Sequence, residues 1–264
     1  MALAPFVRYY WYFEIDEDEL PLAQLSFPYG SFELICYLQN PNLLRWAGTA
    51  NEFFEPDIFY AGQLTKPFIM TFNKKCRCVG ASLQPWAGNQ LYGIPSQQFT
   101  NELVPLNLLE RDDQLYTQLK VCPDKTGLFD CMERYLIGKL LKKHNDPMAR
   151  HLATHIMDSP SRLTLDTIIS AIGLSRRRIE QRFIQSTGLS MGTFIRKIRF
   201  QKAVHLLRDK SLNSDLTNIG LQAGYYDQAH FINDFRAFSG LSPGGFSRQT
   251  TELKDFFKTI VPVN

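Results

Sequence analysis

The stretch GYYDQAHFINDFRAFSGLSPGGF (residues 224–246) decides the fold of the last third of this chain. Its second half, residues 235–246, aligns without gaps on FIQSTGLSMGTF (residues 183–194), and six of the twelve positions are identical. The identities include two glycines, a serine and the phenylalanine at each end. Chance rarely preserves such a set, so the sequence predicts an internal repeat.

The same pattern of helix, tight turn and helix precedes each copy. In the first unit Gly173 supplies the turn and Ser175 can cap the second helix; in the second unit Gly224 and Asp227 take these places. The predicted inward-facing residues are Leu165, Ile168, Ile169, Ile172, Ile179 and Phe183 in the first unit, and Leu216, Ile219, Ala223, Phe231 and Phe235 in the second. A short turn with glycine between two helices is typical of a helix-turn-helix, whose second helix can enter the major groove.

Between the two units, residues 193–210 contain neither proline nor glycine and predict one long helix. Such a helix would hold the units at a fixed separation. Pro147 predicts the start of another helix upstream of the first unit.

Charge divides the chain in the same way. Residues 161–250 hold 13 Lys and Arg against 6 Asp and Glu, whereas residues 1–160 hold 14 against 18. This asymmetry is expected when one domain meets a polyanion, and a solvated basic face explains it equally well.

The first part of the chain has a different character. Short aromatic-rich runs between Pro, Gly and Asn predict antiparallel strands of a barrel or sandwich up to about residue 106, and Leu128, Met132 and Leu136 then follow helical spacing. We therefore predict an α+β chain: a β-rich, barrel-like domain at 1–110, a helical connector at 111–145, an all-α domain at 146–250, and a tail at 251–264 without an assigned role.

The motifs GLSRRRIEQRF, IRKIRFQKAVHLL and GYYDQAHFINDFRAFSGLSP resemble the seven-helix DNA-binding domain of the AraC/XylS family of transcription regulators. The resemblance covers about residues 146–249. Segments such as FPYGSFELICYL resemble the β-rich sensor domain of many members. The chain departs from the family at Ile169 and Gly220, where Ala is preferred, at Met191 in place of Pro, and at Asn233, where many members carry Arg. Glycine inside a helix costs roughly 0.5–1 kcal/mol relative to alanine, so we expect the second unit to be softer.

A recognition helix presents to bases the side chains that its own core does not use, and the family pattern indicates the same face. The predicted base contacts are Arg176, Arg177, Glu180, Gln181, Gln228, His230 and Asn233. Arg can bond guanine, Gln adenine and Glu the amino group of cytosine. The predicted phosphate contacts are Arg182, Arg196, Lys197, Arg199 and Arg248. For Arg182 a structural carboxylate is the alternative, and for each of these cations so is a solvated surface role. Tyr225 is predicted to pack beneath the second turn.

These features predict a sequence-specific transcription regulator that binds double-stranded DNA. The resemblance implies RNA polymerase, a small-molecule effector in the N-terminal domain and a second copy of the chain as further partners. No membrane span or leader is evident, so we expect a cytoplasmic, nucleoid-associated protein. Trp11, Trp46 and Trp86 could line an effector pocket or pack in the core.

Other classes of protein fit the sequence less well. Residues 1–143 contain no histidine, which excludes a His-ligated metalloenzyme in the β domain, and we expect no catalytic residue, cofactor or metal. His151 and His155 have a possible zinc spacing without further ligands. A DNA-repair methyl acceptor with AraC-like helices is one alternative, although none of the five cysteines precedes a histidine; a small-molecule binding protein with incidental DNA contact is the other. Most of the cysteines are expected to be small buried residues.

Overall fold

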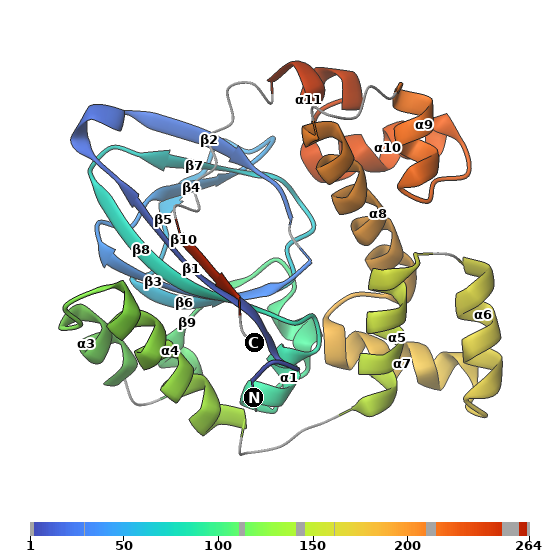
Figure 1. The fold of residues 1–264 in the computed structure, drawn as a ribbon, viewed down its shortest axis with the longest axis horizontal. Coiled ribbons are helices and arrows are strands. Elements are labelled where there is room, and N and C mark those ends of the chain that lie inside the picture. Colours follow the sequence, from blue (N-terminus) through green and yellow to red (C-terminus); the bar gives the residue numbers. More distant parts are fainter. Residues whose placement is uncertain are drawn as a thin grey trace.

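The computed structural model describes residues 3–28, 30–110, 114–140, 146–160, 162–209, 215–249 and 259–262. Two antiparallel β-sheets form the N-terminal part, and a set of helices lies beside them (Figure 1). The predicted α+β class is confirmed. The two sheets face each other without closing, so the barrel-like domain is an open pair of sheets.

The larger sheet contains a strand that the sequence did not predict. Its six strands run in the order β10 (Thr259–Pro262), β1 (Val7–Ile15), β8 (Cys76–Leu83), β3 (Phe32–Gln39), β6 (Ile58–Ala61) and β9 (Leu103–Pro105). The smaller sheet runs β2 (Leu22–Ser26), β7 (Phe68–Phe72), β4 (Leu43–Trp46) and β5 (Glu52–Phe54). Because β10 pairs with β1, the C-terminal tail adds an edge strand to the N-terminal domain.

Side-chain alternation on the central strands gives the larger sheet two apolar faces. On β1, Trp11 and Phe13 join the core shared with the smaller sheet, whereas Tyr10 and Tyr12 join the core on the opposite face. Helices α3 (Gln114–Lys120) and α4 (Lys125–Leu140) cover that second face (Figure 1). Leu128, Met132 and Leu136 are buried there, as their spacing predicted. Shorter helices complete this part: η1 (Glu17–Glu19), α1 (Ala87–Tyr92), η2 (Ser96–Phe99) and α2 (Leu106–Leu109).

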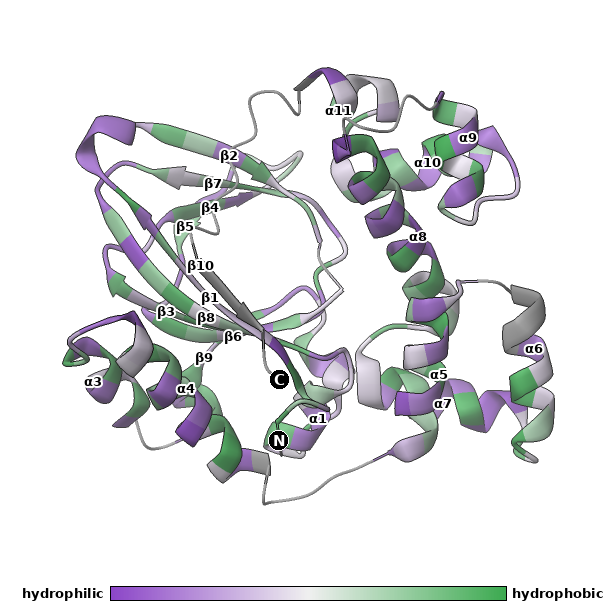
Figure 2. Cartoon of the chain, viewed as in Figure 1, coloured by the Kyte–Doolittle hydropathy of each residue, from purple (hydrophilic) through white to green (hydrophobic). Residues whose placement is uncertain are grey.

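In the described part of residues 146–249, seven helices follow, with the long one in the middle. They are α5 (Pro147–Asp158), α6 (Arg162–Ala171), α7 (Arg176–Thr187), α8 (Met191–Arg208), α9 (Leu216–Gln222), α10 (Gln228–Ser239) and α11 (Pro243–Gln249). Pro147 begins α5 and the predicted linker helix is α8. Along these helices hydrophobic and hydrophilic residues alternate in Figure 2, as expected for helices packed on one side.

The two predicted turns and their caps are confirmed. Gly173 and Gly224 have φ of 71° and 94°, in the left-handed region that favours glycine. Ser175 accepts a hydrogen bond from the backbone N–H of Arg178, and Asp227 accepts one from that of His230. The predicted inward-facing residues with described side chains are buried or partly buried, namely Ile168, Ile169, Ile172, Ile179, Phe183, Leu216, Ile219, Ala223, Phe231 and Phe235. The side chain of Leu165 lies outside the described residues.

Both helix-turn-helix units pack on the β domain. The C-terminal end of α7 contacts α1 and η2, where Ser96 Oγ donates to the carbonyl of Ser186 over 2.8 Å and Thr100 Oγ1 to that of Gly188 over 2.7 Å. In the second unit Phe27, from the segment after β2, packs against rings of α8 and α11. Within the described part of the chain, no helix combines the length and hydrophobicity that a bilayer crossing requires.

Candidate nucleic-acid interface

The two recognition helices, α7 and α10, lie near opposite ends of α8 (Figure 1). Each directs its C-terminal end toward the β domain. Gly188, after α7, lies beside Ser96 and Thr100, and Gly240, after α10, lies beside Pro67. The N-terminal halves, which carry the predicted base-reading residues, therefore lie on the side away from the sheets.

In the first unit the structure separates the predicted base-reading residues into two groups. Arg177 and Gln181 are exposed and, among the described residues, make no hydrogen bond or ion pair. Arg176 is exposed and pairs with Asp166 over 3.1 Å, a contact that contributes little at a surface. Glu180 Oε1 accepts the backbone N–H of Met191 over 3.0 Å, so this carboxylate ties α7 to the start of α8.

Arg182 faces a structural carboxylate. Its guanidinium donates two hydrogen bonds to Asp146, over 2.8 and 2.7 Å, and this pairing raises the pKa of Arg182. Asp146 also caps α5 through the N–H of Ala149, so the pair fixes the start of α5 against α7. Arg182 thus has the structural carboxylate that was the alternative to a phosphate contact.

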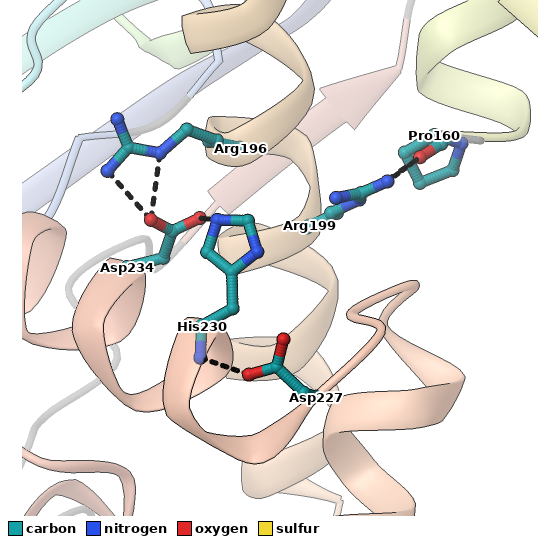
Figure 3. Close-up of polar contacts among 6 residues, drawn as sticks. All are labelled: Pro160, Arg196, Arg199, Asp227, His230 and Asp234. Atoms are coloured by element: carbon teal, nitrogen blue, oxygen red, sulfur yellow. Dashed lines mark hydrogen bonds and ion pairs between the residues drawn. The ribbon is translucent and has the colours of Figure 1, made fainter. Parts of the chain in front are cut away.

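In the second unit Gln228, His230 and Asn233 are all exposed on the first half of α10. The backbone of His230 is held by the cap residue Asp227. Its ring nitrogen Nε2 lies 3.9 Å from Oδ2 of Asp234. Figure 3 shows the ring pointing toward this carboxyl group. Tyr225 is buried beneath the turn, as predicted.

Asp234 is the buried centre of a polar contact between α8 and α10 (Figure 3). Asp234 is 1% exposed. Its Oδ1 accepts hydrogen bonds from Nε and from a terminal nitrogen of Arg196, over 2.8 and 2.7 Å. The pairing raises the pKa of Arg196, whose guanidinium also lies 5.7 Å from the centre of the Phe238 ring. Arg196, predicted to contact phosphate, thus has a structural partner.

A groove follows α8 between the two units. The residues that line it come from the end of α5 and the link after it, from α8, from the second turn and from the start of α10: Asp158, Ser159, Pro160, Gly192, Ile195, Arg196, Arg199, Lys202, Gly224, Tyr225, Tyr226 and His230. Arg199 donates from Nε and a terminal nitrogen to the carbonyl of Pro160, over 3.1 and 2.8 Å (Figure 3). Arg248, at the end of α11, is exposed but does not line this groove.

Two exposed residues that line the groove, Lys202 and Tyr226, were not among the DNA contacts predicted from the sequence. Lys202 follows Arg199 by three residues and so lies on the same helical face, and Tyr226, 93% exposed, stands directly before the cap of α10. Their positions, three residues after Arg199 and directly before the cap residue Asp227, could have indicated that they lie in the groove.

The prediction that Lys197 contacts phosphate does not agree with the structure. Lys197 is fully buried, and its Nζ donates to Oε1 of Gln63 over 2.6 Å and to the carbonyl of Leu64 over 2.7 Å. Both acceptors belong to the segment after β6, so this lysine joins α8 to the β domain and does not reach phosphate in this structure. Burial lowers the pKa of Lys197 to about 7.

This shift predicts a pH dependence. Since the lysine pKa is about 7 when folded and 10.5 when unfolded, the unfolded chain binds more protons between these values, and stability rises with pH across that range. We expect Lys197 to contribute about 2 kcal/mol to a gain in unfolding free energy between pH 7 and pH 9. Urea denaturation at both pH values should show that Lys197→Met removes this gain, while the exposed-site control Lys202→Met keeps it. An equal gain in both variants would contradict the assignment.

The β domain contains a separate cavity between its two sheets. Its lining includes Tyr9, Trp11, Phe13, Gln24, Leu25, Ser26, Phe27, Ser31, Glu33, Ile35, Tyr37, Glu55, Phe59, Ala61, Gly62, Leu64, Phe68, Met70, Leu103 and Arg208. Of the three tryptophans, Trp11 lines the cavity, Trp86 packs with the first helix-turn-helix unit, and Trp46 contacts Phe68. Arg208 comes from α8, so the linker helix contributes to the cavity wall.

The cysteines have the environment of core residues. Cys36, Cys76, Cys78 and Cys131 are buried, as expected for most of the five. Burial raises the pKa of Cys36 and Cys76 to about 12, which disfavours the thiolate that a methyl acceptor needs. Within the described ranges, no three His, Cys, Asp or Glu side chains are placed to hold a metal ion.

Comparison with known families agrees with this division. Residues 168–249 match a family described as a helix-turn-helix domain, and residues 1–105 match a domain of unknown function (DUF6597). The HTH-type transcriptional regulator MtrA of Neisseria gonorrhoeae is 29% identical over 114 residues, covering 43% of this chain and 37% of the relative. The HTH-type transcriptional activator RhaS of Escherichia fergusonii is 27% identical over 139 residues, covering 52% and 46%. The matches thus span less than half the length of these relatives.

Among solved structures, ToxT from Vibrio cholerae in its P21 crystal form resembles the chain over nearly its whole length. The match covers 91% of this chain and 98% of ToxT, with a TM-score of 0.50 and 10% sequence identity. At this identity the likeness shows the two-part fold alone.

Proposed function

We propose that the whole chain is a sequence-specific transcription regulator of the AraC/XylS type, because residues 168–249 match a family described as a helix-turn-helix domain. The observation that carries the proposal is the duplicated unit: two capped recognition helices whose free N-terminal halves both lie away from the β domain. The surplus of 13 basic over 6 acidic residues in 161–250 supports a polyanionic partner.

Base reading is assigned to the exposed side chains of α7 and α10. In this proposal Arg177 and Gln181 read one half of the site, with Arg176 released from its weak ion pair, and Gln228, His230 and Asn233 read the other. Tyr226 and Lys202, from the groove along α8, face the DNA backbone between the halves. Arg199 and Arg248 supply further positive charge near the phosphates.

The geometry of α8 favours one protomer on two successive major grooves. An α-helix rises about 1.5 Å per residue, so its 18 residues span about 27 Å, close to the roughly 34 Å of one DNA turn. Because the two exposed sets of side chains differ, the two half-sites should differ in sequence, and the site of one protomer should not be palindromic.

We further propose that the cavity of the β domain binds a small-molecule effector. Arg208 of α8 lines it, which gives a bound molecule direct contact with the linker helix. A second copy of the chain and RNA polymerase complete the proposed set of partners, and the protein would act in the cytoplasm at the nucleoid. Burial of four cysteines argues against the methyl-acceptor alternative.

Selection of random DNA duplexes with the purified full-length chain tests the regulator proposal. We expect a site with two unlike halves about one helical turn apart and affinity that falls steeply with salt. Arg177→Ala should relax one half only, with a loss of discrimination of about 1–3 kcal/mol, because Arg177 is proposed to bond base edges.

Arg178→Ala is the matched control, since it removes the same charge one residue further along an exposed segment of α7. It should leave the selected motif unchanged. Failure to enrich any sequence would contradict the regulator proposal. If Arg177→Ala and the parent select the same motif, Arg177 does not read bases.

A further inference from the structure

The cavity between the sheets contains a carboxyl group at an unusual place. Glu33 lies on β3, a central strand of the larger sheet, and lines the cavity. One oxygen accepts from Nε1 of Trp11 over 2.9 Å and the other from Oγ of Ser31 over 2.7 Å. These neutral donors hold the carboxyl group in a fixed orientation. Loss of hydration raises its pKa, and the hydrogen bonds from Ser31 and Trp11, with a smaller effect from the charge of Arg8, oppose this rise only in part.

A second carboxyl group lines the same cavity. Glu55 is buried and hydrogen-bonded to Tyr37, and burial raises its pKa to about 7. Among the described residues, neither Glu33 nor Glu55 forms a salt bridge. Removing a carboxylate from water without a cationic partner is unfavourable, so a positive charge inside the cavity would stabilise both groups.

The side chains that line the cavity are suited to contact the apolar part of an organic cation. Aromatic side chains outnumber the other large apolar residues of the lining: Tyr9, Trp11, Phe13, Phe27, Tyr37, Phe59 and Phe68. The face of an aromatic ring attracts ammonium groups, most strongly when water is excluded. Gly80 on β8 provides room for this wall, because a Cβ there would lie 2.2 Å from the Trp11 ring.

The one basic side chain of the described lining is Arg208, which is exposed and so lies at the solvent end. The cavity measures about 140 Å³, close to the roughly 150 Å³ of an engineered cavity that admits benzene. From the carboxylates, the aromatic wall and this size, we propose that the cavity binds a small organic ammonium ion, with Glu33 as its anionic partner and an apolar body about one ring in size. This inference deepens the proposed effector-responsive function and rests on it.

A charge series on the full-length wild-type chain tests the ligand class without DNA. The probes are 2-phenylethylammonium, the neutral 2-phenylethanol and the anionic phenylacetate, with binding measured by calorimetry. We expect the ammonium ion to bind at least tenfold more tightly than either analogue. Equal or tighter binding of a neutral or anionic probe would overturn the inference, and so would the absence of binding by all three at millimolar concentration.

Glu33→Gln keeps the shape of the side chain and removes its charge. It should weaken ammonium binding by roughly ten- to a hundredfold and leave the weak binding of 2-phenylethanol unchanged. Glu17→Gln, at an exposed site, is the control and should bind like the parent. An unaltered ammonium affinity in Glu33→Gln would reject Glu33 as the partner. Because DNA binding is measured separately, failure here is distinguishable from failure of the regulator proposal.

Discussion

Replacing Phe200 by alanine is expected to lower the free energy of unfolding by about 3–5 kcal/mol. Phe200 is 1% exposed on α8, and its ring centre lies 5.1 Å from that of Phe235 and 5.3 Å from that of Phe238. Phe27 of the β domain packs on the same ring. The alanine variant would therefore open a cavity at the point where the linker helix, the second unit and the β domain meet. Urea denaturation followed by circular dichroism measures the loss.

The control is Phe54→Ala, which makes the same deletion at a side chain that is 69% exposed on β5. Its effect should stay within about 0.5 kcal/mol. We also expect Phe200→Ala to weaken DNA contacts of the second unit more than those of the first, because Phe200 packs against α10. A loss below about 1 kcal/mol for Phe200→Ala would show that α8 and α10 do not share this core.

Local sequence rules predicted the helix-turn-helix units well, because each signal acts within a few residues. Gly173 and Gly224 adopt left-handed backbone, and Ser175 and Asp227 cap the helices that follow. The repeat strengthened these predictions, because the same turn and cap positions occur in both copies, each of which forms a core of its own.

Contacts between distant segments could not be predicted in this way. Lys197 meets Gln63, 134 positions earlier in the sequence, and only the tertiary fold brings them together. A weak signal existed, because Lys197 lies three residues from both Phe194 and Phe200, which share one side of the α8 helix with it. The predicted phosphate contact rested on the cluster of Arg196, Lys197 and Arg199, without regard to the helical face that carries each of them.

For the same reason β10 was not predicted, and the prediction for Gly220 was incomplete. A four-residue tail strand has no partner signal of its own until β1 offers an edge. Gly220 was expected only to soften α9, yet a Cβ there would lie 3.1 Å from the ring of Phe231, so its absence also lets α9 approach α10 closely. Helix propensity describes one of these effects and packing the other.

The ion pair between Arg196 and Asp234 should show an asymmetric response to substitution. Arg196→Met is expected to lower the unfolding free energy by about 2–4 kcal/mol, because it leaves the buried carboxylate of Asp234 without its main partner. Asp234→Asn should cost less, since the half-exposed guanidinium of Arg196 can return to water and the amide keeps a hydrogen-bond acceptor. Urea denaturation of both single variants and the double variant measures the difference.

This asymmetry separates a structural role of Arg196 from a role in phosphate binding. If Arg196 mainly serves DNA, Arg196→Met would lower affinity and leave stability close to that of the parent. If it holds α8 to α10, the double variant should be more stable than Arg196→Met alone, because Asp234→Asn removes the uncompensated buried charge. Arg236→Met, on the exposed side of α10, is the control for losing an arginine from this unit and should change stability by no more than about 0.5 kcal/mol. A double variant as unstable as the sum of both singles would contradict the coupling that the structure shows.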